Sequence, residues 1–387
     1  MKNFFLSVTL YILKIGLKVI YFFIKLFTKT KNKVTMLSRQ SDNINIDFEL
    51  IKEELEKINN FQSSNNATDS KLKIEILCKK IPSGILGKIS YCFYMIKCMY
   101  HIANSKVCII DGYNIAISVL KHKKSLKVIQ IWHAMGAIKK FGYQVLDRKE
   151  GSNSKVAKIM KMHANYDLVT CTSRETRRIY SEAFNIDINK IEVLGMPRID
   201  YILEKDKKIN EKLENLYKDY PKLKEKKNIV YVPTFRKNET IDIEQIVSEI
   251  DEEKYNLIVR LHPLDKTKVD NKYVIDGKYS TFDLIKMADY VITDYSAIAF
   301  EVATLNKPLF FYLYDIDKYE SSRGLNINLK EEMKNSTKQN IKDIIKIIEN
   351  NTYDYEELKK FREKYVQTVD IDNSKRIVEY VNNSLKE

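Results

Sequence analysis

Short apolar runs alternate with longer stretches of helical periodicity along most of the chain, from about residue 70 onward. Continuous apolar runs between polar residues predict strands buried on both faces, and the stretches between them predict helices that cover a parallel sheet. A first series of such runs lies at 73–78, 106–111, 127–132, 167–171 and 190–195. A second series lies at 228–233, 255–261, 273–277, 290–294 and 308–313.

The stretches around these runs predict helices at 86–103, 155–164, 174–184, 336–350, 355–367 and 373–385. The whole pattern predicts an α/β chain with two doubly wound Rossmann-like domains facing a cleft, at 71–200 and 201–387. In sheets of this kind ligands bind beyond the carboxyl ends of the strands. Polar residues that directly follow the expected strands are therefore the candidates for a site.

Residues 1–34 form a basic, apolar segment that precedes this pattern. The longest uncharged run, 3–13, is too short to cross about 30 Å of hydrocarbon. Lysines at 14, 18, 25 and 29 recur on one face of a helix, which favours a helix lying in the membrane interface with its lysines toward the headgroups. A tilted span with snorkelling lysines and an ordinary packed helix remain alternatives. Residues 35–70 are polar and are interpreted as a tether with a short helix.

The formal charge of +14 comes from 66 basic and 52 acidic residues. Eight of the basic residues, and no acidic one, lie in residues 1–41. A basic flank on an apolar segment favours an anionic membrane surface as a partner and not nucleic acid. The five cysteines form no CxxC pair and show no zinc-binding spacing, which is typical of free thiols in a reducing compartment.

The stretch QIWHAMGAIKKFG, residues 130–142, places His133 directly after an expected strand. A histidine at that edge can act as a base near neutral pH. Packing against Trp132 or capping of the next helix is the alternative. Lys139 and Lys140 follow, where they can face a diphosphate or lie exposed in solvent.

The stretch RLHPLD, residues 260–265, ends another expected strand. Arg260 and His262 alternate, so their side chains point to the same side, and Pro263 ends the strand. An arginine and a histidine that converge in this way can hold a phosphate. The alternative is an edge strand with two exposed polar residues.

Two further stretches follow expected strands of the second half. In TDYSAIAFE, Ser296 is an expected N-cap whose helix can bind a phosphate, and Glu301 can accept from ribose hydroxyls. In VPTFRKN, Thr234 and Arg236 can approach a phosphate from a loop. Simple helix capping with a solvated glutamate is the alternative for the first stretch. The chain contains no Walker loop, GxGxxG or DxD, so Arg, His, Lys and helix ends would have to supply phosphate binding.

Taken in order, the sequence resembles the CDP-glycerol glycerophosphotransferase family of teichoic acid synthesis. The matching segments span about 126–315 and are QIWHAMGAIKKFG, CTSRETRRIYSEAFNI, VLGMPRIDYI, VYVPTFR, IVRLHP and MADYVITDYSAIAFEVATLNKPLFFYLYD. The resemblance implies a fold of the glycosyltransferase-B type and peripheral attachment to the cytoplasmic face of the membrane. It also implies transfer of a polyol phosphate from a CDP-activated donor to a prenyl-diphosphate-linked acceptor, with release of CMP. No cofactor and no metal site are predicted, and the sequence leaves the metal dependence of the reaction open.

The same resemblance implies roles for individual residues. His133 matches a general base, and Arg260 and His262 match contacts to the donor phosphates. Asp294, Ser296 and Glu301 match a motif on the nucleotide side of the site. The resemblance places the acceptor on the 71–200 domain and the CDP donor on the 201–387 domain.

Several alternatives stay open from the sequence. Glycerol phosphate is the favoured group, with ribitol phosphate as the alternative. A nucleotide-sugar glycosyltransferase of the same fold and a non-catalytic binder of nucleotide or glycan are the competing functions. The sequence does not decide between transfer of one unit and of many, or whether the chain forms a homo-oligomer.

Overall fold

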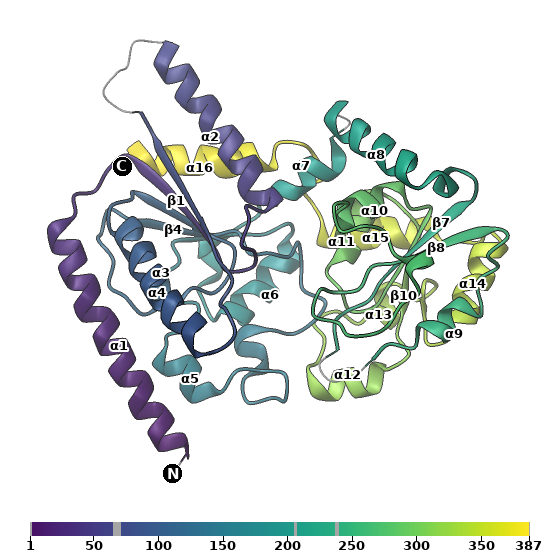
Figure 1. Cartoon of the computed structure of the whole chain (residues 1–387), viewed down its shortest axis with the longest axis horizontal. Helices are drawn as coiled ribbons and strands as arrows, with labels where there is room; N and C mark the ends of the chain where they lie inside the picture. Colours follow the sequence, from purple (N-terminus) through teal and green to yellow (C-terminus); the bar gives the residue numbers. More distant parts are fainter. Residues whose placement is uncertain (1, 65–70, 205–206, 237–239, 387) are drawn as a thin grey trace. The chain divides into compact units, whose positions relative to one another are not determined.

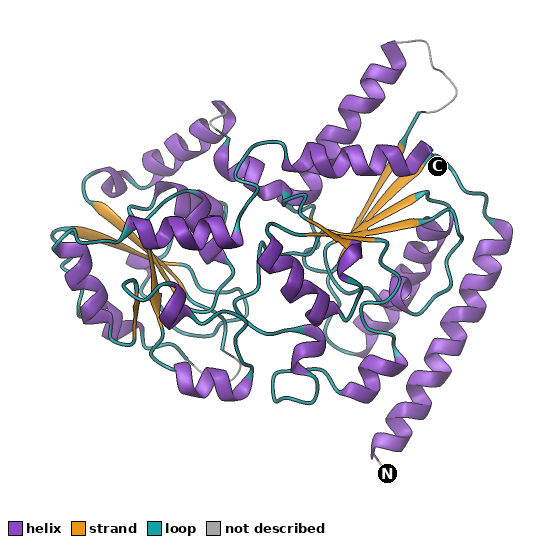
Figure 2. Cartoon of the chain, turned by 180° about the vertical axis from the view of Figure 1, so that it is seen from behind, coloured by secondary structure: helices purple, strands orange, loops and turns teal. Residues whose placement is uncertain are grey.

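Two parallel sheets organise the chain, each in its own unit of a computed structural model that describes residues 2–64, 71–204, 207–236 and 240–386. The first unit comprises Met1–His133, Phe141–Asp200 and Asp372–Glu387. The second comprises Ala134–Lys140 and Tyr201–Ile371. Figure 2 shows the strands of each sheet with helices around them. This is the α/β architecture that the alternating pattern predicts.

The first sheet has six parallel strands in the order β2-β1-β3-β4-β5-β6. Their bounds are β1 Lys33–Ser38, β2 Lys73–Cys78, β3 Val107–Ile110, β4 Lys127–Gln130, β5 Leu168–Thr170 and β6 Ile191–Glu192. The chain pairs β2 on one side of β1 and then β3 on the other. The topological switch point, where doubly wound sheets bind ligands, therefore lies between β1 and β3.

The helices of the first unit are α1 Lys2–Phe27, α2 Ile46–Ser64, α3 Ile85–Ala103, α4 Ile115–Ser118, α5 Ser154–Ile159, α6 Arg174–Phe184 and α16 Asn373–Lys386. Short 3₁₀ turns occur at Gly142–Val145 and Ile188–Lys190. Helices α2 and α16 lie side by side in Figure 1 and pack on the same core. Helix α7, Pro197–Leu203, carries the chain from the first unit into the second.

The polar tether expected at 35–70 is wrong for its first part, because residues 33–38 are a buried strand inside the sheet. Helix α2 also belongs to the core, through Phe48, Ile51 and Leu55, which recur at helical spacing. The average polarity of this region conceals these few apolar positions. Residues 65–70 of the expected tether lie outside the described residues.

Helix α1 contacts α3 and α5 of the first unit. Leu17 and Tyr21 are buried there, and the lysine ammonium groups of Lys14 and Lys25 donate to the carbonyls of Ile159 and Lys121. These two lysines therefore face the protein and not lipid headgroups, contrary to the expectation. Within the described residues, one helix is long and apolar enough to cross a membrane, at Ser7–Phe27 with a mean hydropathy of 1.7, and only 11% of that window is buried.

The second sheet has five parallel strands in the order β11-β10-β9-β7-β8. Their bounds are β7 Lys227–Val232, β8 Tyr255–Val259, β9 Tyr290–Thr293, β10 Leu309–Tyr312 and β11 Thr337–Lys338. The helices are α8 Lys207–Asp219, α9 Ile243–Val247, α10 Thr281–Met287, α11 Ile298–Thr304, α12 Ile316–Ser322, α13 Leu329–Glu332, α14 Ile341–Glu349 and α15 Tyr355–Tyr365. Short 3₁₀ turns occur at Pro221–Lys224 and Asn271–Tyr273. The switch point of this sheet lies between β7 and β9.

Two predicted elements of the second unit are wrong in detail. The strand expected at 273–277 is a 3₁₀ turn and a loop, whose Tyr273 and Ile275 are buried, Tyr273 in the same core as side chains of β8. The helix expected at 336–350 begins only at Ile341, because Thr337 and Lys338 form the short edge strand β11. The first error arises from apolar side chains that are buried without forming a strand, and the second from a polar stretch, 336–340, that was counted with the helix after it.

The unit boundaries also differ from the expected division at residue 200. Residues 134–140 lie in the second unit, although they directly follow a strand of the first. Residues 372–387 return to the first unit, where Ile377, Val378 and Val381 of α16 join the core. Asp200 fixes this return by accepting the backbone N–H groups of Asn373 and Ser374.

Candidate active site

The switch point of the first sheet holds a buried carboxylate. Asp111, directly after β3, accepts hydrogen bonds from the Ser38 hydroxyl at 2.6 Å and the Asn45 amide at 2.8 Å. No ion pair joins it to a cation among the described residues. Burial raises the pKa of Asp111 to about 6, with nearby Asp47 adding to the rise. This edge therefore carries a carboxylate whose ionised form is poorly stabilised.

His133 lies at the same carboxyl edge, three residues after β4, and is exposed. Its Nδ1 lies 3.1 Å from the backbone carbonyl oxygen of Asp111. Because a carbonyl oxygen can only accept, this contact places the proton of the neutral ring on Nδ1, and it is shorter than the 3.4 Å contact between Nδ1 and the Gln40 amide nitrogen, which would favour the other tautomer. The lone pair of the neutral ring then lies on Nε2, the nitrogen that would act as a general base.

A strained tryptophan precedes this histidine. Trp132 has a φ of 58°, a conformation that is rare for a bulky residue, and its N–H donates to the Gln130 side chain. The centre of the indole ring lies 4.2 Å from the centre of the His133 ring. The indole also stacks on the Phe141 ring, with 5.0 Å between the ring centres. Strain of this kind persists only where the surroundings fix it, and here it orients the histidine ring.

Arg39 is a candidate that sequence analysis missed, because residue 39 was placed in the tether. It follows β1 at the switch point, half-buried, with its guanidinium 5.6 Å from the centre of the Tyr113 ring. No hydrogen bond or ion pair joins it to another residue in the described part of the chain. A guanidinium with unused donors at this edge can bind an anion. The signal in the sequence was a basic residue just beyond the run VTML, residues 34–37, with one serine between them.

Lys139 and Lys140, which the sequence predicts to face a diphosphate on the acceptor side, lie in the second unit. The segment 134–140 pairs there with the loop 323–326, through an Asn326 N–H to Ile138 carbonyl bond of 2.7 Å and a Lys140 N–H to Gly324 carbonyl bond of 3.0 Å. A Cβ on Gly136 would lie 2.6 Å from a ring carbon of Phe300. The backbone around Lys139 and Lys140 is thus tightly held, while their side chains are half-buried.

The switch point of the second sheet is closed by a buried ion-pair cluster. Asp294, after β9, accepts the Thr234 N–H at 2.9 Å and an Arg236 guanidinium N–H at 2.7 Å. Arg236 also forms two hydrogen bonds to Asp315, after β10, and lies over the ring of Tyr319. Burial by itself lowers the pKa of Arg236, but the two carboxylates outweigh it and raise the pKa.

Arg236 and Asp294 are 6% and 0% exposed. Their observed partners are inside the protein, so the structure gives them the role of holding strand ends together. The predicted contacts of Arg236 with phosphate and of Asp294 with nucleotide stay predictions. Thr234 has a buried hydroxyl with no hydrogen-bond partner among the described residues, in addition to its bonded N–H.

Arg260 and His262 follow β8, at the same edge. Arg260 donates one hydrogen bond to the Tyr279 carbonyl, and its Nε has no partner in the described part of the protein. His262 is exposed, and its Nδ1 accepts the N–H of Leu264 at 3.2 Å. In the neutral ring the proton therefore lies on Nε2, which makes this histidine a hydrogen-bond donor toward the outside.

The remaining two candidates lie near α11. Ser296 is half-buried and is not the N-cap, because the helix begins at Ile298 after Ala297. Its hydroxyl accepts the Ile298 N–H at 3.4 Å, which is a weak contact. Glu301 is 2% exposed within α11. The predicted contact of Glu301 with ribose would require this buried carboxylate to become accessible.

Comparison with known proteins adds to this geometry. The profile of the family CDP-Glycerol:Poly(glycerophosphate) glycerophosphotransferase matches residues 20–383. A teichoic acid ribitol-phosphate primase of Bacillus spizizenii is 28% identical over 92% of each chain. A teichoic acid glycerol-phosphate primase of Bacillus subtilis is 33% identical, over 75% of this chain and 77% of the relative.

The fold is also that of a solved protein. A variant of the wall teichoic acid polymerase TagF soaked with CDPG has a TM-score of 0.72 over 100% of this chain and 98% of that chain. Its sequence is 20% identical, so this likeness shows the glycosyltransferase-B type of fold alone. By the match over residues 20–383, the chain belongs to the CDP-glycerol:poly(glycerophosphate) glycerophosphotransferase family of enzymes.

Proposed function

We propose that this enzyme transfers a polyol phosphate from a CDP-polyol to a hydroxyl of a prenyl-diphosphate-linked acceptor, in the synthesis of teichoic acid or a related surface polymer. The observation that carries the proposal is the pair of histidines at the two carboxyl edges. His133 presents an acceptor nitrogen, whereas His262 presents a donor nitrogen. A base for the acceptor hydroxyl and a donor for the phosphate charge are the two groups that this reaction needs.

In the proposed step, Nε2 of His133 takes the proton of the acceptor hydroxyl. The hydroxyl oxygen forms a bond to the β-phosphorus of the CDP-polyol. The bond between that phosphorus and the bridging oxygen breaks, and CMP leaves with the bridging oxygen and its electron pair. Phosphoryl transfer depends mainly on alignment and on stabilising charge, so the residues that hold the phosphates contribute as much as the base.

The second unit would bind the donor. Arg260 and the Nε2–H of His262 supply charge and hydrogen bonds to the diphosphate, and the Thr234 hydroxyl and Ser296 add neutral contacts. Arg236 is proposed to act as a positioning residue, because its partners Asp294 and Asp315 already use its donors. The first unit would bind the acceptor, with Arg39 as a contact for one of its phosphates.

Glycerol phosphate is the group that we favour, with ribitol phosphate as the alternative. The two relatives described above carry these two names, one each. Both are named as primases, which supports transfer of a first unit onto a linker.

We further propose that the enzyme works peripherally on the cytoplasmic face of the membrane. The outward face of α1 is apolar, with exposed Ile12, Ile15, Phe22, Phe23 and Phe27. Because Lys14 and Lys25 anchor the other face to the protein, α1 would lie along the surface. Figure 1 shows α1 along the side of the first unit. Attachment would bring the enzyme to a lipid-linked acceptor.

The test is release of CMP by the purified full chain in detergent. CDP-glycerol, CDP-ribitol and UDP-sugars are offered in parallel with a prenyl-diphosphate disaccharide, with and without one glycerol phosphate already attached. We expect CMP release that depends on the acceptor. Release of UDP would move the chain to the glycosyltransferases, and donor binding without release on any acceptor would favour the non-catalytic alternative.

A further inference from the structure

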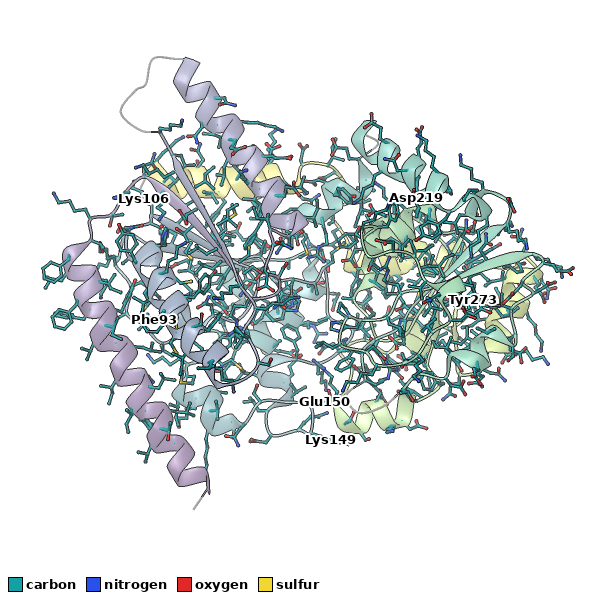
Figure 3. All side chains as sticks on the ribbon, viewed as in Figure 1. Phe93, Lys106, Lys149, Glu150, Asp219 and Tyr273 are labelled. Atoms are coloured by element: carbon teal, nitrogen blue, oxygen red, sulfur yellow. The ribbon has the colours of Figure 1, made fainter. Side chains whose placement is uncertain are left out.

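Helix α3 carries an exposed apolar stripe, the α3 stripe, made of Leu86, Ile89, Phe93, Ile96 and Tyr100. These residues recur every three or four positions, so they share one face of the helix. Leu86 is 84% and Phe93 70% exposed, and Phe93 is labelled on α3 in Figure 3. Helix α3 packs against α1, whose outward face is also apolar. Two neighbouring helices thus expose apolar side chains that a soluble surface rarely gathers.

A cavity of about 500 Å³ lies at the end of this stripe, lined by Tyr100 of the stripe itself. Its charged groups are four lysines and one carboxylate, Lys31, Lys33, Lys71, Lys73 and Glu75. His101 also lines it. This lysine cavity lies at the amino ends of β1 and β2, which Lys33 and Lys73 begin. The proposed active site lies at the opposite, carboxyl edge of the same sheet. The lysine cavity is therefore a separate site.

Lys33 is the deepest cation of this cavity, with 5% of the residue exposed. Its ammonium donates to Nδ1 of His101 at 2.7 Å and to the Asn104 side chain at 3.0 Å. The third N–H of the ammonium has no partner within the described ranges. Burial lowers the pKa of Lys33 to about 8, since Glu75 only partly compensates the charge. A buried cation of this kind is stabilised by an anion.

We propose that the lysine cavity binds the phosphate of an anionic lipid headgroup, with the acyl chains along the α3 stripe and α1. Four lysines against one glutamate give the cavity an excess of positive charge that a phosphate matches. Tyr100 belongs to both the cavity and the stripe, so an occupant with one anionic end and one apolar end fits both surfaces. The inference rests on the proposed membrane attachment but not on the transfer reaction.

The test compares the full chain with a variant that carries Lys31→Gln, Lys71→Gln and Lys73→Gln, which leaves the buried Lys33 in place. The matched control carries Lys334→Gln, Lys342→Gln and Lys360→Gln, three exposed lysines of the second unit. Sedimentation with phosphatidylcholine vesicles, with and without phosphatidylglycerol, measures attachment at physiological ionic strength. Titration with monomeric dihexanoyl-phosphatidylglycerol measures the site itself, with glycerol 1-phosphate and inorganic phosphate in parallel.

We expect the cavity variant to lose about tenfold or more of its binding to anionic vesicles and to the monomeric lipid, and the control to lose less than about twofold. Attachment to pure phosphatidylcholine, which reports α1 and the α3 stripe, should stay unchanged in both. Equal losses in cavity variant and control would overturn the proposal in favour of general surface charge. Unchanged binding of the monomeric lipid would overturn it as well.

Two further measurements are needed. One distinguishes a lipid phosphate from a soluble phosphate as the ligand, and the other distinguishes lipid binding from the proposed transfer reaction. If glycerol 1-phosphate or inorganic phosphate binds as tightly as the monomeric lipid, the ligand is a soluble phosphate and the lipid assignment is wrong. Lys33→Met provides a second variant in which only the buried cation is removed, and it should abolish binding of the monomeric lipid. CMP release measured in detergent reports the transfer reaction independently and should not change in the cavity variant.

Discussion

The two switch points share one arrangement, an aspartate bonded to the end of the first strand, but differ in how the charge of that aspartate is balanced. In each sheet an aspartate that follows the third strand in sequence accepts a hydrogen bond from the end of the first strand: Asp111 from Ser38 in one, Asp294 from Thr234 in the other. Asp294 is neutralised by Arg236, which also pairs with Asp315. Asp111 has no paired cation in the described part of the chain, and its pKa is raised to about 6. The same topology thus supports one rigid edge and one electrostatically strained edge.

This difference agrees with the roles proposed for the two units. A donor site must present fixed donors to a diphosphate, and the Arg236 cluster ties three strand ends together behind such donors. At the first edge, by contrast, no ion pair to Asp111 is present among the described residues. Strain and incomplete pairing at one edge are what a functional site often shows.

The largest expected effect is that of His133→Ala, which removes the base from the strained edge. CMP release should fall by about 10²- to 10⁴-fold, the usual contribution of a general base, while thermal unfolding stays unchanged. Added imidazole should restore part of the rate, because it can replace the missing ring. A variant that keeps full turnover would remove the base assignment.

Arg236→Met should have the largest effect on stability, since it leaves Asp294 and Asp315 buried without a cation. The free energy of unfolding of the second unit should fall by about 3–5 kcal/mol, measured in urea. Arg260→Met is the matched control, because that arginine forms no ion pair among the described residues. It should cost little stability but raise the KM for the CDP-polyol. Equal stability losses in both variants would refute the special role of Arg236.

Asp111→Asn should relieve the strained edge in a pH-dependent way. The pKa of about 6 in the folded state lies above the ordinary value of 3.8, so the carboxyl group favours folding below pH 3.8 and loses that contribution as the pH rises through 6. Relative to the unmodified chain, the variant should therefore gain roughly 2–3 kcal/mol in unfolding free energy between pH 4 and pH 7. Asp317→Asn, which changes an exposed aspartate in the same way, is the control. If the difference in unfolding free energy between variant and unmodified chain stayed constant from pH 4 to pH 7, the raised pKa of Asp111 would be contradicted.

The smallest expected effect is that of Arg39→Gln. This variant removes a guanidinium that has no hydrogen-bond or ion-pair partner among the described residues. The KM for the prenyl-diphosphate-linked acceptor should rise by about tenfold, as for loss of a hydrogen bond to a charged group, with little change in kcat. Arg39→Lys should recover part of the affinity. A rise in the KM for the CDP-polyol instead would place Arg39 on the donor.

Much of this architecture was predictable because it depends on local patterns. The apolar runs at 73–78 and 290–294 became strands, and residues that follow strands, such as His133 and Arg260, lie at the carboxyl edges. The role of Arg236 was not predictable, because its partner Asp315 is 79 residues away and only the folded sheet brings them together. Strand β1 was missed because a long basic segment precedes its few apolar residues.

The return of residues 372–387 to the first unit sets the order in which the two units can be completed during synthesis. All residues of the second unit precede residue 372, so that unit can be complete while the first still lacks α16. The core of the first unit includes Ile377 and Val381, and its earlier residues must wait for them. At about 5–20 residues per second, the ribosome needs on the order of ten seconds or more for the intervening stretch. The complete core of the first unit can therefore form only after the second unit has been synthesised.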